Sequence, residues 1–114
     1  MPLGEKQIKL CRALNVIEAF FFAMGYDPVR EDARRAEEVH GKFGVKSSYS
    51  AAFSVHKLKL AQDYTIKRDG KYPLPEKEEA RILNQAHDIG DMLGLAKRIN
   101  GDLGHFSMEH QGHR

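Results

Sequence analysis

A histidine and an aspartate lie seven positions apart near the middle of the chain, as His56 and Asp63. Side chains alternate between the two faces of a strand, so this odd separation would put the two on opposite faces of one unbroken strand. We therefore expect His56 to end the preceding loop and Asp63 to project from the strand that follows. The Ser- and Ala-rich residues 47–54 are typical of such a loop.

A second pair, Asp102 and His105, occurs near the C-terminus, and Gly101 and Gly104 allow the backbone there to turn tightly. Two imidazoles and a carboxylate are a donor set of catalytic zinc sites, in which three protein ligands leave a fourth position for water. The remaining carboxylate, Asp102, suits the base that takes and returns the proton of that water. Spacing alone also fits a simpler alternative, in which these are unrelated loop, strand and turn residues.

The order Ser54-x-His56-x6-Asp63, followed by Asp102-x-x-His105, resembles the D-Ala-D-Ala carboxypeptidase family of zinc peptidases, which includes phage L-alanyl-D-glutamate endolysins. The string HGKFGVKSSYSAAFSVHKLKLAQDY, with DGKY and GHFSMEHQG after it, is similar to small phage and prophage members. The resemblance implies a hedgehog/DD-peptidase-like fold that binds Zn²⁺ through His56, Asp63 and His105. It also implies that Asp102 is the catalytic base and that Ser54 binds the substrate or supports a ligand.

The same resemblance implies an upstream arginine that binds substrate and stabilises the developing oxyanion. Arg35 aligns best with it and Arg34 is the neighbour that can substitute, both within the run EDARRAEE. The permanent charge and forked donors of arginine suit a carboxylate or an oxyanion. The alternative for both arginines is a solvated helix face, with nearby glutamates as partners. Lys59 departs from the pattern, because many members have glycine there.

The periodicity of apolar residues predicts an amphipathic helix over residues 5–24, ended by Gly25, with Cys11 on the buried face. Pro28 favours a short strand or loop within residues 26–35. At least one ring of the Phe20-Phe21-Phe22 run must point away from the core.

Further along, alternation predicts a half-buried strand over residues 58–67, and residues 68–71 carry a turn signal. We expect Tyr72 to begin a short return strand. A second helix is predicted over residues 76–93, with His87 exposed or half-buried on it. The last elements are a strand from His105 to His110 and a frayed tail holding His113.

The chain has 114 residues, which predicts a single domain over residues 1–114, and the order of its elements favours an α+β fold with an antiparallel sheet and flanking helices. Eighteen Lys and Arg against sixteen Asp and Glu give a net charge of +2, too balanced to favour nucleic acid as the main partner. The longest apolar run, residues 19–24, is too short for a membrane span or a signal peptide. We therefore expect synthesis in the cytoplasm without a signal peptide.

The resemblance implies a zinc metallopeptidase, a hydrolase that cleaves peptidoglycan stem peptides as a bacteriophage endolysin does in cell wall degradation. The bond cleaved is left open between L-alanyl-D-glutamate endopeptidase and D-Ala-D-Ala carboxypeptidase action. Such an enzyme would reach the cell wall after holin-type release or from a virion, as a monomer or weak homo-oligomer. Two alternatives remain: a non-catalytic phage structural or peptidoglycan-binding protein with the same fold, and a weakly basic module that binds nucleic acid or protein through the lysines of residues 57–71.

Overall fold

The computed structural model describes residues 1–31 and 58–114 of the chain. Its elements, in chain order, are helix α1 (Leu3–Ala23), strand β1 (Asp27–Glu31), strand β2 (Ala61–Lys67), helix α3 (Glu76–Met92) and strand β3 (His105–Ser107). The strands form an antiparallel sheet in the order β1-β2-β3. The predicted α+β class with an antiparallel sheet is therefore confirmed for the described residues, whereas the zinc-peptidase version of that fold stays a prediction.

Helix α1 begins two residues before the predicted helix and ends one residue before its predicted end, and most of its buried face was predicted. The buried residues are Leu10, Ala13, Leu14, Ile17 and Phe21. Cys11 is exposed, so the prediction that it belongs to the core is wrong. Cys11 follows Leu10 by about 100° around the helix. Apolar residues occur on every side of this helix, Ile8 and Phe22 being 56% and 61% exposed, so spacing alone does not identify the packed face.

Strand β2 shows the predicted alternation of its side chains. Tyr64 and Ile66 are buried on one face, whereas Asp63 and Thr65 are half-buried on the other. Phe21 and Tyr64 pack ring against ring with centroids 6.0 Å apart, which joins α1 to the sheet. The helix-facing side of the sheet is thus part of the core, and Asp63 projects from the opposite side.

A tight turn follows β2, as predicted. Arg68 and Lys71 pair through reciprocal backbone hydrogen bonds, and the two residues between them, Asp69 and Gly70, have φ values of 52° and 74°. Positive φ at both central positions is the geometry of the hairpin turn that suits twisted strands. Tyr72 does not begin a return strand: it is exposed and precedes Pro73, which cannot donate to a strand ladder.

Helix α3 begins directly after Pro75 with three glutamates in its first turn, as the helix dipole favours, and ends one residue before the predicted position. His87 is buried, with only 2% of its surface exposed, so the prediction of an exposed or half-buried side chain is wrong. Its position has a physical reason, because Leu83, His87 and Gly90 follow one another at helical spacing on the buried face.

Strand β3 is shorter than predicted and ends at Ser107. The chain nevertheless continues along β2, because the Met108 amide donates to the Leu60 carbonyl over 2.9 Å. The tail is not frayed: His110 and His113 exchange backbone hydrogen bonds, and the Lys6 ammonium donates to the Glu109 carbonyl over 3.0 Å. The end of the chain is thus held against the start of α1.

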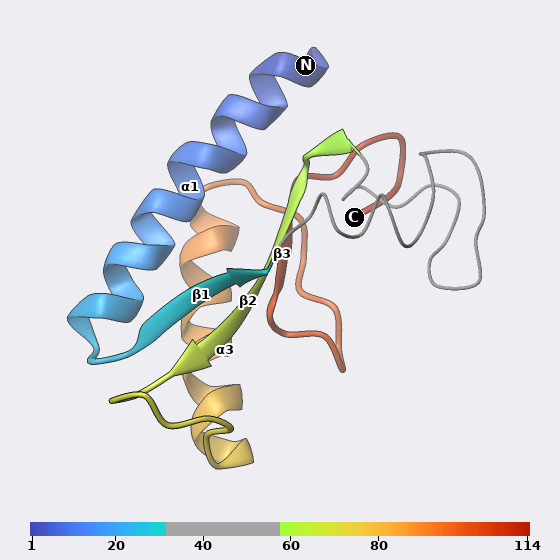
Figure 1. Ribbon diagram of the computed structural model, residues 1–114. Helices are drawn as coiled ribbons and strands as arrows, with labels where there is room; N and C mark the ends of the chain where they lie inside the picture. The colour runs from blue at the N-terminus through green and yellow to red at the C-terminus, as the bar shows by residue number, and fades with distance from the viewer. Residues whose placement is uncertain (32–57) are drawn as a thin grey trace.

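Both helices contribute to the core that covers one face of the sheet (Figure 1). The largest fully buried side chains of this core are Phe21, Phe106, Ile17, Leu60, Ile66, Ile82 and His87. Within residues 1–31 and 58–114, neither helix combines the length and the apolar character that crossing a membrane requires.

Candidate metal centre

Asp63 lies on β2, the central strand of the sheet. Its backbone pairs with Glu31 of β1 on one side and with His105 of β3 on the other. Residues directly opposite each other in antiparallel strands point to the same face. The sheet register therefore brings the Asp63 and His105 side chains together on the face away from the helices.

Asp102 reaches the same place through two consecutive turns. The Asp102 amide donates to the Ile99 carbonyl over 3.0 Å, and the His105 amide donates to the Asp102 carbonyl over 3.2 Å. Gly101 has a φ of 84°, a conformation that glycine adopts without strain. The predicted tight turn is present, and it places the exposed Asp102 beside the first residue of β3.

Gly104 allows this turn to approach the sheet. A Cβ atom at Gly104 would lie 2.7 Å from the Tyr64 carbonyl oxygen, closer than a methyl group can approach. The Tyr64 amide in turn donates to the Gly104 carbonyl over 2.9 Å. Glycine is therefore required here for close backbone contact, a role that the sequence pattern did not reveal.

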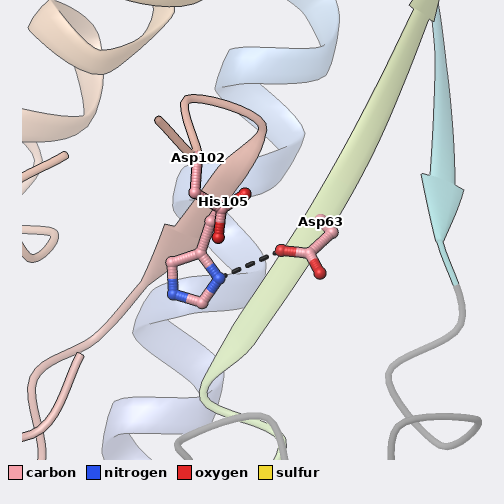
Figure 2. Close-up of side chains that lie close together, drawn as sticks. All are labelled: Asp63, Asp102 and His105. Carbon is pink, nitrogen blue, oxygen red and sulfur yellow. Dashed lines mark hydrogen bonds and ion pairs between the residues drawn. The ribbon is translucent and has the colours of Figure 1, made fainter. Parts of the chain in front are cut away.

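The ligand atoms of Asp63, Asp102 and His105 all lie within 4.8 Å of one another. Nδ1 of His105 lies 3.0 Å from Oδ1 of Asp63, and a dashed line marks this contact in Figure 2. The His105 side chain is 7% exposed and that of Asp63 is 41% exposed. One buried imidazole thus lies beside two carboxylates that solvent can reach.

This arrangement fits a divalent cation. Zinc bonds of about 2.1 Å in tetrahedral geometry put neighbouring donor atoms about 3.4 Å apart, so the separation of His105 from Asp63 is compatible with a shared metal. The carboxylates of Asp63 and Asp102, with oxygens within 4.8 Å of each other, repel each other when both are charged, and a bound cation would offset that repulsion. The structure therefore provides a candidate metal-binding triad of Asp63, Asp102 and His105.

Asp102 also lines a second surface. Together with Glu76, Glu79 and Gly104 it borders a hollow of about 470 Å³ between the turn and the start of α3. Its carboxylate is therefore less enclosed than the Asp63–His105 pair. A general base that takes a proton from water and passes it on needs access to solvent more than a metal ligand does.

Four of the predicted site residues, Ser54, His56, Arg34 and Arg35, lie outside the described residues. The structure therefore brings together Asp63, Asp102 and His105 and does not test the rest of the predicted set. Another arginine, Arg30, lies on β1, but it pairs with Glu18 of α1 and so faces the helix side of the sheet.

The Arg30 contact belongs to a separate polar cluster. Tyr64 donates to Glu18 over 2.5 Å, and Arg30 donates to both oxygens of the same carboxylate. Burial works to raise the pKa of Glu18, but the hydrogen bonds from Arg30 and Tyr64 and the Arg30 charge bring it below its usual value. Burial and the bond to Glu18 raise the pKa of Tyr64. This cluster joins α1 to two strands and takes no part in the metal centre.

No protein-family model matches this chain, and neither a curated protein nor a solved structure matches it. The resemblance to zinc peptidases thus depends on the sequence patterns, and the metal centre depends on the geometry of the described residues.

Proposed function

We propose that the protein is a zinc-dependent peptidase that acts on peptidoglycan stem peptides. The convergence of Asp63, Asp102 and His105 supports this proposal, because it brings the last residue of the first predicted motif beside both residues of the second, about 40 positions later in the chain. The substrate class comes from the sequence resemblance alone.

In this proposal Asp63 and His105 hold the metal, with His56 as the third ligand expected from the sequence. A zinc ion bound there would lower the pKa of a water molecule and polarise the scissile carbonyl. The contact of 3.0 Å between Nδ1 of His105 and Oδ1 of Asp63 holds the imidazole ring beside the carboxylate.

Asp102 has the role of general base. Its carboxylate, close to the two ligands and open to solvent, takes the proton of the attacking water and passes it to the leaving amine. Arg35, or its neighbour Arg34, would bind the substrate and stabilise the oxyanion. Ser54 would hydrogen-bond the substrate close to His56.

The proposal is tested by digesting purified peptidoglycan and identifying the products by mass spectrometry, with and without a chelator. Asp102→Asn removes the base, and Asp27→Asn, an exposed aspartate on β1, is the matched control. We expect new termini that require metal and Asp102 and are unaffected by the control substitution. The new amino terminus would identify the bond.

Two results would contradict the proposal in different ways. Protein that holds one zinc per chain but releases no product would exclude peptidoglycan hydrolysis and favour a binding protein with the same fold. Protein that binds neither zinc nor cobalt would exclude the metal centre itself.

A further inference from the structure

Behind the candidate metal centre, on the helix side of the sheet, His87 of α3 makes two contacts. Its ring stacks on Phe106 of β3 with centroids 4.0 Å apart and an interplanar angle of 9°. Its Nε2 atom lies 2.8 Å from the carbonyl oxygen of Leu103. The side chain is 2% exposed, so both contacts are shielded from solvent.

The chemistry of the second contact assigns the proton. A carbonyl oxygen only accepts hydrogen bonds, so Nε2 of His87 carries the proton and donates it to Leu103. Burial lowers the pKa of His87, which favours this neutral ring. The buried imidazole therefore acts as a directional donor to the turn, a role that no apolar side chain can supply.

The two contacts lie on either side of His105. Leu103 precedes this ligand by two residues and directly follows Asp102, whereas Phe106 comes immediately after it. One side chain from α3 therefore contacts the backbone of Leu103 before the ligand and the ring of Phe106 after it. Because a β3 side chain alternates in direction, fixing Phe106 against the helix also fixes His105 toward Asp63.

We propose that His87 is a positioning residue that holds the turn and β3 in the conformation that binds the metal. This inference rests on the proposed function, since it assigns His87 a role at the same centre. Groups that orient metal ligands without touching the metal commonly change metal affinity by about 10- to 100-fold when they are removed. His87 acts in this way on the backbone that carries His105 and Asp102.

The test uses the full chain and cobalt as the probe, with metal affinity measured by chelator competition and ligand geometry by the visible absorption of bound cobalt. His87→Phe keeps a ring for stacking but removes the donor, and His87→Leu removes both contacts. His87→Gln retains an amide donor at a similar reach. We expect about 10-fold weaker cobalt binding and an altered spectrum for the first two variants, with partial recovery for the third.

A matched substitution separates positioning from general stability. Ile82 is buried on α3, and Ile82→Val removes one methylene group from the core without removing a hydrogen bond. We expect Ile82→Val to lower the unfolding temperature without changing cobalt affinity or the cobalt spectrum. If it weakens cobalt binding as much as His87→Phe does, or if His87→Gln recovers nothing, the positioning role is overturned.

Amide hydrogen exchange of the metal-free protein tests the same inference without metal. We expect faster exchange at Tyr64 and His105, whose amides bond to the turn, in His87→Phe than in Ile82→Val. Equal exchange in the two variants would overturn the inference. If the wild-type chain binds no cobalt but exchange changes as expected, the proposed function fails while the positioning of the turn by His87 stands.

Discussion

At the scale of single residues, Asp63 and Asp102 carry the same carboxylate in different surroundings. Asp63 lies on the central strand and contacts the buried imidazole of His105 at 3.0 Å. Asp102 is exposed and lies in a turn. A ligand benefits from a fixed position, whereas a proton carrier needs access to water and to the leaving group. The surroundings therefore favour Asp63 as ligand and Asp102 as base.

Conversion of each aspartate to asparagine should separate these roles. We expect Asp63→Asn to weaken zinc binding by at least about 10-fold, because the amide is a neutral and poorer ligand. We expect Asp102→Asn to keep one zinc per chain and to lose about 10²- to 10⁴-fold in turnover, the usual contribution of a general base. Zinc content after dialysis and chelator competition measure the first effect, and product release measures the second. Loss of zinc in both variants would make Asp102 a ligand.

The close approach of Gly104 to β2 gives a second prediction at this scale. Gly104→Ala would put a methyl group 2.7 Å from the Tyr64 carbonyl, so the turn must move away from the strand. We expect a loss of about 2 kcal/mol in the free energy of unfolding, together with weaker metal binding. Urea denaturation and chelator competition measure the two effects.

Gly4→Ala is the control for that substitution, because nothing lies within 4 Å of a Cβ atom at this position of α1. We expect it to leave metal binding unchanged and to stabilise the helix by up to about 1 kcal/mol. If Gly104→Ala is as stable as Gly4→Ala, the turn does not need its contact with β2.

At the scale of elements, the sequence predicted the helices and the central strand because their signals are local. Glu76–Met92 directly follows Pro75 and has three glutamates in its first turn, and Ala61–Lys67 alternates in polarity. The exposure of Cys11 was not predictable in the same way, because apolar residues surround α1 and its contacts with the sheet and with α3 select the buried side. His87 was misplaced for a related reason, since polarity suggested exposure while its spacing from Leu83 fits the buried face.

The entry to β2 gives a prediction at this scale. Lys59 has a φ of 56°, in the left-handed region that favours glycine, and it stands where many members of the resembled family have glycine. An L-residue in this conformation costs about 1 kcal/mol, and the greater freedom of glycine in the unfolded chain offsets part of any gain. We expect Lys59→Gly to raise the free energy of unfolding by about 0.5 kcal/mol.

Lys67→Gly, at the other end of the strand, serves as the comparison for Lys59→Gly. Lys67 pairs with Asp27 in the sheet, so glycine there should destabilise the protein by about 1 kcal/mol. Denaturant titration of both variants measures the difference. Destabilisation of similar size at both positions would show that Lys59 contributes contacts that outweigh its strained backbone.

At the scale of the whole molecule, the two faces of the sheet have different roles, one in the core and one at the candidate metal centre. Leu60, Tyr64 and Phe106 face the helices and build the core, while Asp63 and His105 face the other way. The sequence predicted this division because alternation assigns faces. It did not predict the pairing of β2 with β3, which brings the two site residues within hydrogen-bonding distance, because register depends on contacts between distant segments.

His87 lies in the core and donates a hydrogen bond to Leu103 of the turn that carries Asp102 and His105. Its burial predicts that folding stability depends on pH. Burial is the main cause that lowers the pKa of His87, and the positive charge of Arg98 lowers it further. The hydrogen bond to Leu103 and the negative charge of Asp91 raise the pKa of His87 and so oppose this lowering. His105 lowers the pKa of His87 as well, and its effect is the smallest. The folded protein therefore binds fewer protons at this site than the unfolded chain, whose histidine has a pKa of about 6.5.

Stability should consequently be complete above about pH 6.5 and fall as the pH drops from there toward the lower folded-state pKa of His87. One such proton changes the free energy of unfolding by at most about 1.4 kcal/mol per pH unit. Glu18 contributes only under more acidic conditions, because its pKa is lowered from 4.5. We expect urea titrations of the metal-free protein between pH 7.5 and 5.5 to show a slope that is smaller in His87→Gln. Parallel slopes would mean that His87 gains its proton equally well in the folded and unfolded chains, which would contradict its burial as a neutral donor to the turn.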